Sequence, residues 1–266
     1  MCGRFVSATS PDEIAKYFDA STVDEALLEP SYNVAPTNDV YVVVEEPGPS
    51  GREPGEARVR RVEAFHWGLV PFWAKSPAVG NKMINARAET LAEKGAFKRA
   101  FTKRRCIIPA DGFYEWAEVP GQKKKKQPMY VERTDGAPFA FAALWEVWRG
   151  AENDDSDHLR STTIITGQPN EKMAEIHDRM PVMLAPEAWE TWLDPDVRDL
   201  ELLGELLVPA PSSLITMHPV STEVNDVRND GPQMRDQAPT VAEVEAAEAA
   251  MKGEQGTLGD LAAERG

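Results

Sequence analysis

Residues 129–148 read Met-Tyr-Val-Glu-Arg-Thr-Asp-Gly-Ala-Pro-Phe-Ala-Phe-Ala-Ala-Leu-Trp-Glu-Val-Trp. Two β-prone runs, Met129–Arg133 and Pro138–Trp148, flank the turn pair Asp135-Gly136. Asp-Gly between such runs is the strongest hairpin signature in the chain, because both residues tolerate the positive φ angles of a tight turn. We therefore predict a β-hairpin centred on residues 135–136.

The segment just before it has the same character. Cys106–Pro109 and Phe113–Ala117 surround Asp111-Gly112, which is a second turn signal. Further strands are predicted at Arg4–Val6, Val40–Val44, Val59–His66, Ser161–Thr166 and Leu214–His218.

Helices are predicted between these strands. Ser10-Pro11-Asp12-Glu13 has the residues of a capping box with proline in the first turn. The other helical segments are 88–105 with a break at Gly95, 170–176, 186–193 and 196–207. Because strands and helices do not alternate regularly, we predict an α+β fold with a mostly antiparallel, barrel-like β-sheet and peripheral helices. The expected boundaries are one domain over 2–232 and an acidic Ala/Glu-rich tail over 233–266; Glu46–Glu56 reads as a Pro/Gly-rich loop.

Composition limits the classes of protein that fit. No apolar run in the 266 residues approaches the ~20 that a membrane helix needs, and no signal-peptide pattern is present. The chain has two cysteines, which makes a disulfide framework implausible and predicts a reducing, cytoplasmic setting. The cysteines and four histidines lack metal-ligand spacing, so we expect neither a metal nor another cofactor.

The net charge of −15, taken alone, argues against nucleic acid as a partner. The positive charges, however, are concentrated in the middle of the chain. They fall at Lys98-Arg99, Lys103-Arg104-Arg105 and Lys123–Lys126. A local basic face on an acidic body therefore remains open.

Cys2 is the residue with the most distinctive chemistry. Removal of Met1 would leave one residue with an α-amine and a thiol on adjacent carbons. Their reference pKa values are about 8 and about 8.5, so both are usable nucleophiles near neutral pH. Together they can convert an aldehyde first to an imine and then to a five-membered thiazolidine. The alternative interpretation is a small, buried, inert cysteine.

Imine formation requires groups that move protons, and His177 and Glu115 are the natural candidates. Histidine titrates near neutrality, and Glu115 stands between Tyr114 and Trp116, where it can be partly desolvated. The alternatives are a helix-end histidine bonded to Asp178 and an ordinary exposed carboxylate.

Other polar and aromatic residues fit a nucleic-acid contact. Asn85, Arg87 and Arg4 supply hydrogen bonds and positive charge that suit phosphate oxygens. Trp67, Trp73 and Trp116 could stack on exposed bases, a contact worth ~1–3 kcal/mol per base. Arginines of this kind are more often surface ion-pair partners, and tryptophans more often belong to the core.

These residues lie in motifs that occur in a specific order. The motifs are Met1–Phe5, Tyr32–Pro36, Trp67–Trp73, Ile84–Thr90, Asp111–Trp116 and His177–Pro181. In this order they resemble the SRAP family, the SOS response-associated peptidases, which are abasic-site processing proteins that crosslink to DNA. The resemblance runs from Cys2 to about Asn229. It departs at Thr166-Gly167-Gln168-Pro169-Asn170, where two threonines followed by small residues are expected.

The resemblance implies roles for individual residues. Cys2 would capture the ring-opened aldehyde of an abasic site as a stable thiazolidine. His177 would catalyse ring opening as an acid, Glu115 would transfer protons at the amine, and Asn85 would orient the sugar or the amine. It also implies DNA contacts by Arg4, Arg87, Pro36, Trp116 and Thr166.

Three functions are therefore carried forward. The leading one is a covalent sensor of abasic sites in single-stranded DNA, an enzyme with Schiff-base chemistry, which we expect to be a cytoplasmic, nucleoid-associated monomer. The second is a cysteine-type peptidase that uses Cys2 and His177, at least on its own Met1 or a propeptide. The third is a DNA-binding module in which Cys2 is only buried.

Overall fold

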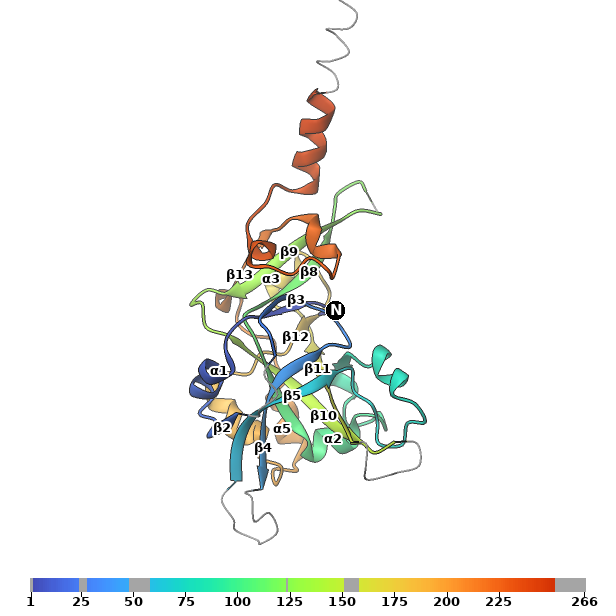
Figure 1. The fold of residues 1–266 in the computed structure, drawn as a ribbon, viewed down its shortest axis with the longest axis vertical. Coiled ribbons are helices and arrows are strands. Elements are labelled where there is room, and N and C mark those ends of the chain that lie inside the picture. Colours follow the sequence, from blue (N-terminus) through green and yellow to red (C-terminus); the bar gives the residue numbers. More distant parts are fainter. Residues whose placement is uncertain (1, 24–27, 48–57, 123, 151–157, 252–266) are drawn as a thin grey trace, which may run out of the picture.

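The computed structural model describes residues 2–23, 28–47, 58–122, 124–150 and 158–251 (Figure 1). Two sheets make up the β-structure. The smaller sheet has the order β13 (Ile215–Pro219), β9 (Lys126–Arg133), β8 (Gly112–Glu118), β1 (Phe5–Ser7), β3 (Ser31–Val34). The larger one runs β12 (Met180–Pro181), β11 (Leu159–Gly167), β10 (Phe139–Trp148), β7 (Arg105–Ala110), β4 (Asp39–Pro47), β5 (Arg58–Trp67), β2 (Thr22–Val23), with β6 (Asn85–Arg87) beside β11.

The larger sheet closes on itself. Strands β11, β10, β7, β4 and β5 are joined in that order by antiparallel pairs. A parallel pairing of β11 with β5, at Ser161–His66 and Thr162–Trp67, then joins the two ends of this row. The result is a five-stranded barrel, so the predicted α+β fold with a mostly antiparallel, barrel-like sheet is confirmed.

Strand β10 shows why the barrel forms. Phe139, Phe141, Ala143 and Trp145 belong to one buried cluster together with Cys2 and Phe5. The alternate residues Ala140, Ala142 and Leu144 belong to a second cluster, which also contains residues of the helices outside the barrel. Alternate side chains of a barrel strand point inward and outward, so this near-continuous apolar run is buried on both faces.

The predicted hairpin at Asp135-Gly136 is wrong. Strand β9 pairs with β8 and β13, whereas β10 pairs with β7 and β11. A turn is present, with Gly136 at φ 72° and its N–H donating to Arg133 O at 3.2 Å, but it moves the chain from one sheet to the other. Turn residues fix a change of direction; they do not decide which strand is the hydrogen-bonding partner.

The actual hairpin turns earlier in the sequence, between β8 and β9, and contains the lysine run. Its two arms are long and bent: β7 continues into β8, and β9 continues into β10. One half, with Phe139 opposite Ala110, lies in the barrel; the other, with Gly112 opposite Glu132, lies in the smaller sheet. Gly112 lies at the bend, where an added Cβ would overlap the Tyr130 ring. Lys123 of the run lies outside the described residues.

Helices cover the outside of the barrel. They are α1 (Pro11–Tyr17), α2 (Lys98–Lys103), α4 (Trp189–Leu193) and α5 (Leu200–Glu205), whereas α3 (Glu171–Ala174) lies beside the smaller sheet (Figure 1). Short 3-10 helices are η1 (Pro77–Lys82), η2 (Ala88–Thr90), η3 (Pro186–Ala188), η4 (Ser212–Leu214), η5 (Thr222–Asn225) and η6 (Pro232–Arg235). The capping box predicted at Ser10 and Glu13 is present. The helix predicted over 88–105 is shorter than expected, because only Lys98–Lys103 is α-helical and Arg105 already belongs to β7.

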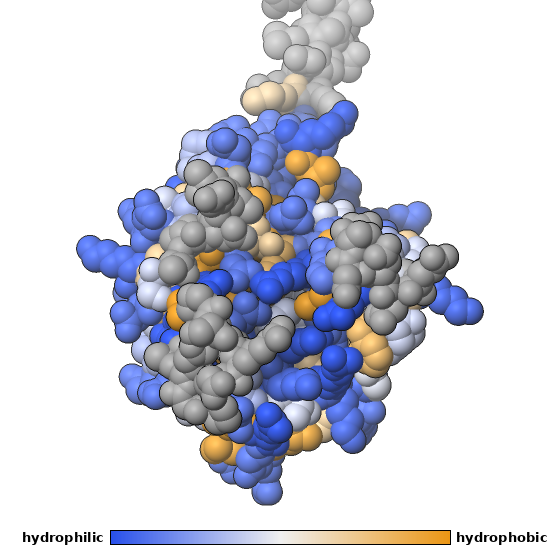
Figure 2. Space-filling view, turned by 60° about the horizontal axis from the view of Figure 1, so that its bottom comes forward, coloured by the Kyte–Doolittle hydropathy of each residue, from blue (hydrophilic) through white to orange (hydrophobic). Residues whose placement is uncertain are grey.

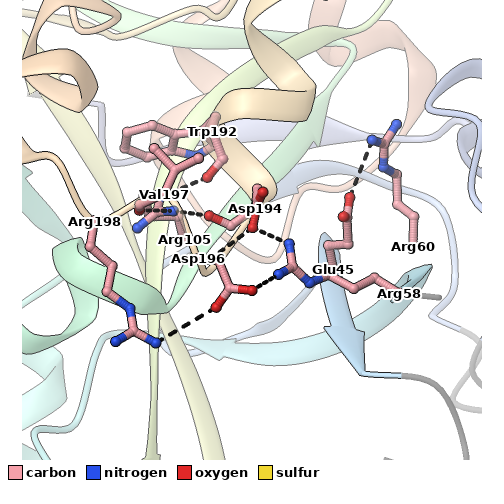
Figure 3. A network of polar contacts seen from close by, with 9 residues as sticks. All are labelled: Glu45, Arg58, Arg60, Arg105, Trp192, Asp194, Asp196, Val197 and Arg198. Atoms are coloured by element: carbon pink, nitrogen blue, oxygen red, sulfur yellow. Dashed lines mark hydrogen bonds and ion pairs between the residues drawn. The ribbon is translucent and has the colours of Figure 1, made fainter. Parts of the chain in front are cut away.

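Arg105 fastens α4 to the barrel (Figure 3). Its buried guanidinium donates to the carbonyl oxygens of Trp192 at 2.7 Å and Val197 at 3.0 Å, and also to that of Asp194. Burial lowers the pKa of Arg105 to about 10. The neighbouring Arg58 pairs with Asp194 and Asp196. One buried cation thus satisfies the carbonyl groups where α4 ends.

The chain after β13 wraps back over the smaller sheet. Val220, Val224 and Met234 pack on Tyr114 and Tyr130. A helix over 241–251 then extends away from the body, along the vertical axis of Figure 1. Of the predicted Pro/Gly-rich loop Glu46–Glu56, Glu46 and Pro47 instead end β4, and residues 48–56 lie outside the described residues.

Candidate functional site

Cys2 is buried at the junction of the two sheets. Its side chain has no exposed surface, and its carbonyl oxygen accepts a hydrogen bond of 2.8 Å from Asn85 Nδ2. Burial, followed by the negative charge of Glu115, raises the pKa of the Cys2 thiol well above its usual range. The thiol is therefore protonated at neutral pH, and its backbone is held by an amide side chain.

Glu115 and His177 face each other beside Cys2. Glu115 lies on β8 and is 4% exposed. His177 Nε2 lies 3.8 Å from Glu115 Oε1, and the backbone N–H of Arg179 donates to His177 Nδ1 at 3.0 Å. Nδ1 contacts both this N–H donor and the Asp178 carboxylate, which would require Nδ1 to accept and to donate respectively, so these contacts do not fix the tautomer of the ring. At 3.8 Å, His177 Nε2 and Glu115 Oε1 are too far apart for a direct hydrogen bond, so a proton passes between them only through an intervening oxygen, such as that of a water or a substrate.

A short helix positions His177. Asn170 caps α3 by accepting a hydrogen bond of 2.9 Å from Met173 N, and its Nδ2 donates to Ala210 O at 2.9 Å. Residues 166–170 are the segment in which the sequence differs from the family pattern. These two hydrogen bonds fix the position of its last residue, Asn170. Asp178 is also close, with Oδ1 3.0 Å from His177 Nδ1, although its carboxylate is largely exposed.

Arg179 links the histidine segment to the strand that carries Asn85. Its guanidinium reaches the two oxygens of Glu89 at 2.6 and 2.9 Å and donates to Thr166 O at 2.6 Å. The ion pair holds the pKa of Glu89 at about 2. Glu89 follows β6 in the motif Ile84–Thr90, so two of the sequence motifs are fastened to each other.

Two buried polar atoms beside this link have no hydrogen-bond partner in the described part of the chain. They are Asn85 Oδ1 and Thr166 Oγ1. Their strands are adjacent, with Ile164 paired to Asn85 and Thr166 to Arg87 in parallel register. A buried polar atom without a partner costs ~1–3 kcal/mol, and an ordered water or a ligand atom would satisfy it.

Arg4, two residues after Cys2, is held by residues from three other parts of the chain. It donates to Asn33 Oδ1 at 2.7 Å and to Val224 O at 2.8 Å, and lies over the Trp116 ring at 5.8 Å. Burial lowers the pKa of Arg4. Trp116, in turn, donates from Nε1 to Asn225 Oδ1 at 2.7 Å. Arg4 and Trp116 thus form one fixed, partly exposed unit.

Asn33 was not among the residues predicted from the sequence, although it lies in the motif Tyr32–Pro36. Besides accepting from Arg4, its Nδ2 donates to the carbonyl oxygens of Val224, Asp226 and Asn229 at 3.2, 3.1 and 2.7 Å. A single buried amide therefore connects the C-terminal wrap to Arg4.

Pro36 is presented by a strained turn. Thr37 has φ 73°, an uncommon value for a non-glycine residue. The turn is tied to β5 by Thr37 N to Trp67 O and Trp67 N to Asn38 O, both 2.9 Å. The backbone of Trp67 thus holds the turn that projects Pro36.

The Trp67 side chain itself is not available to a base. It has no exposed surface, packs on Phe5 at 5.1 Å between ring centroids, and donates from Nε1 to Ile84 O. An enclosed indole offers no face for stacking, so Trp67 is reassigned to the core. Trp73, by contrast, is 55% exposed, and Arg87 is exposed on β6.

Among the described residues, no group of His, Cys, Asp and Glu side chains could hold a metal ion, and no helix has the length and apolarity to cross a membrane.

Comparison with known proteins identifies the family of the chain. The profile of the family SOS response associated peptidase (SRAP) matches residues 1–227. The chain belongs to the SRAP family. Abasic site processing protein YoqW of Bacillus subtilis is 40% identical over 235 residues, which cover 88% of this chain and 98% of that protein.

Two further comparisons extend the range of SRAP relatives. Abasic site processing protein HMCES of Xenopus tropicalis is 31% identical over 267 residues, covering 88% of this chain and 77% of that protein. A crystal structure from Bacteroides thetaiotaomicron has a TM-score of 0.73 at 24% identity and covers 90% of this chain and all of that one, which shows the shared fold.

Proposed function

We propose that this SRAP protein processes abasic sites in single-stranded DNA and forms a covalent crosslink through Cys2. The observation that carries the proposal is the arrangement around Cys2: Asn85 holds its carbonyl at 2.8 Å, and Glu115 and His177 face each other beside it. The names of the SRAP relatives, which state abasic-site processing, support the same substrate.

The chemistry proceeds in two steps. Once Met1 is removed, the Cys2 amine attacks the aldehyde carbon of the ring-opened sugar, and the resulting carbinolamine loses water to give an imine. The thiol sulfur then adds to the imine carbon, and the thiol proton moves to nitrogen. The product is a thiazolidine, and the overall change is loss of one water.

The thiol can take part without being a thiolate beforehand. Burial keeps it protonated, so the amine acts first and the sulfur closes the ring on an electrophile already held next to it. In this scheme His177 donates a proton during ring opening, and Glu115 accepts one from the amine. Asn85 Oδ1 and Thr166 Oγ1, which have no partner among the described residues, are placed to bond the sugar.

The predicted DNA-contacting residues favour single-stranded DNA as the substrate. Arg4 and Arg87 would contact phosphates, while Pro36, Trp73 and Trp116 would pack on bases that a duplex keeps stacked. We further propose a monomer in a reducing compartment, as two free, buried cysteines allow. Size-exclusion chromatography of the free protein tests the oligomeric state.

The experiment compares wild type with Cys2→Ala and Cys2→Ser on a single-stranded oligonucleotide with one abasic site. Wild type is expected to give a heat-stable adduct, Cys2→Ser at most a labile imine, and Cys2→Ala no thiazolidine. A heat-stable adduct of equal yield with Cys2→Ala overturns the mechanism. Binding that is tight but fully reversed by denaturation, for all variants, indicates the non-covalent DNA-binding module instead.

The peptidase alternative has weaker support. A cysteine hydrolase needs a thiolate, whereas burial and Glu115 raise the pKa of this thiol. Intact mass spectrometry of His177→Ala tests it, because retention of Met1 in that variant alone would support autoprocessing.

A further inference from the structure

The structure contains a pocket of about 230 Å³ away from Cys2, lined by Phe72, Arg99, Arg104, Val147 and Arg149. Of these, Arg99 lies on α2, Val147 on β10, and Phe72 in the loop after β5. The chain as a whole carries a net charge of −15, so three arginines around one small pocket stand out as a local exception.

The arginines are close enough to affect one another. Arg104 lies within electrostatic reach of Arg99, Arg149 and Arg160, and this repulsion, after burial, lowers the pKa of Arg104 to about 10. Arg104 is anchored by an ion pair with Glu146, whose side chain is 2% exposed. Arg99 is exposed and forms no ion pair with any described residue. Repelling cations at a solvent-facing pocket favour the binding of an anion.

Aromatic surface adjoins the positive charge. Phe72 is 47% exposed and Trp73 is 55% exposed, and the Arg99 guanidinium lies 4.4 Å from the Phe72 ring centroid. Exposed rings interleaved with arginines are the combination that holds a single nucleic-acid strand, with rings stacking on bases and guanidinium groups on phosphates. Figure 2 shows the lower face of the molecule covered mostly by hydrophilic side chains, with small separate hydrophobic patches.

The distance from the abasic-site residues follows from strand geometry. Val147, at the pocket, pairs with Arg160 at one end of β11, and Thr166 lies six residues further along this strand. At about 3.3 Å per residue the separation is about 20 Å, a distance that a single strand spans with several nucleotides. In Figure 1 the N-terminus lies toward the smaller sheet, and α2 toward the opposite end of the barrel.

We propose that the pocket of Phe72, Arg99, Arg104 and Arg149, with Trp73 beside it, binds the phosphate backbone of the DNA strand about 20 Å, and so several nucleotides, from the abasic site. The inference rests on the proposed function for the identity of the strand. Its role is to hold long strands, and the chemistry at Cys2 does not depend on it.

The test uses two abasic single strands, one with about two nucleotides on each side of the lesion and one with about ten. Arg99→Glu is expected to weaken binding of the long strand about five- to ten-fold. Its salt slope should also become shallower, by ~0.7 for each phosphate that the variant no longer neutralises. The short strand, which does not reach the pocket, is expected to crosslink at the wild-type rate. Phe72→Ala is expected to weaken binding of the long strand with an unchanged salt slope.

Lys16→Glu is the matched control, because it makes the same change of charge on an exposed residue of α1, on the other side of Figure 1. The proposal that this pocket binds DNA is overturned if Arg99→Glu and Lys16→Glu weaken binding of the long strand equally. It is also overturned if Arg99→Glu weakens binding of the long and short strands equally. Binding of an undamaged long strand, measured by fluorescence anisotropy, gives the same comparison if wild type forms no crosslink. Failure of the proposed chemistry is thereby separated from failure of the pocket.

Discussion

Arg179 and Glu89 form a two-pronged ion pair, with N–O distances of 2.6 and 2.9 Å, that fastens the segment of His177 to the strand of Asn85. The third bond of Arg179, to Thr166 O at 2.6 Å, adds β11 to the same link. Because these bonds join the segments that carry His177 and Asn85, we interpret Arg179 and Glu89 as positioning residues. Bidentate pairs of this kind add geometric precision as well as attraction.

Glu89→Gln keeps the shape but removes the charge, so we expect His177 to lose its fixed orientation toward Glu115. The first-order crosslinking rate at saturating DNA should fall about ten-fold, which corresponds to about 1.4 kcal/mol in the barrier. The Kd for undamaged DNA should stay within a factor of about two. Gln168→Ala, which removes only the 3.4 Å hydrogen bond to the same carboxylate, is the control. A fall in affinity with an unchanged rate would contradict the positioning role.

The same pair predicts how stability depends on pH. The pKa of Glu89 is lowered to about 2 in the folded protein, from an ordinary value of about 4.5. A depressed carboxylate pKa stabilises the folded state above the unfolded pKa, and this contribution disappears as pH falls from about 4.5 to about 2. Glu89→Gln should therefore show a smaller decrease in stability across this range than wild type in urea melts. If the free energy of unfolding falls equally in both proteins over this pH range, the Arg179–Glu89 pair does not contribute to stability.

The Cys2 thiol should be mostly protonated at neutral pH and should react with alkylating agents only through its small thiolate fraction. Because burial and Glu115 raise its pKa, its alkylation by iodoacetamide should keep rising about ten-fold per pH unit up to at least about pH 10. A free cysteine, with a pKa near ~8.5, would level off earlier. Peptide mapping separates Cys2 from Cys106, whose pKa burial raises to about 12. A plateau below about pH 8 for Cys2 would instead indicate the thiolate of a hydrolase.

Gly112 should be intolerant of a side chain at the bend of the long hairpin. An added Cβ would overlap Tyr130, whose ring is buried and cannot withdraw easily. Gly112→Ala should cost about 1–3 kcal/mol in the free energy of unfolding, the usual range for overpacking. Gly95→Ala, where a Cβ meets nothing within 4 Å, is the matched control. Equal melting temperatures for the two variants would contradict the steric clash expected between a side chain at position 112 and Tyr130.

The fold class was predictable from the sequence because the apolar runs and turn signals are local features. The pairing of β9 and β10 was not, because Asp135-Gly136 specifies a turn of the backbone and cannot say whether the next strand stays in the same sheet. The long helix predicted over 88–105 failed for a related reason. Cys106 and Ile107 are needed on opposite faces of the barrel wall, and β7 therefore begins at Arg105.

The site was predictable where the chemistry depends on residue type. The structure brings Glu115 next to His177 and Asn85 onto the Cys2 carbonyl, while the roles of these residues in the reaction stay predictions. The role of Trp67 was not predictable, because a tryptophan in a motif looks the same whether its ring or its backbone is used. Other residues act by holding partners that are distant in the sequence, as Asn33 holds Val224 and Arg179 holds Glu89. Such roles become visible only when the chain is folded.

The central claim is that Cys2 captures an abasic site with both its amine and its sulfur, and intact mass spectrometry after borohydride treatment tests it most directly. The account predicts an adduct of the protein without Met1 plus the abasic strand, less one water, whose mass borohydride leaves unchanged because a thiazolidine has no imine to reduce. An adduct that gains two hydrogens would show that the sulfur does not close the ring, and the absence of any covalent adduct would contradict the account altogether.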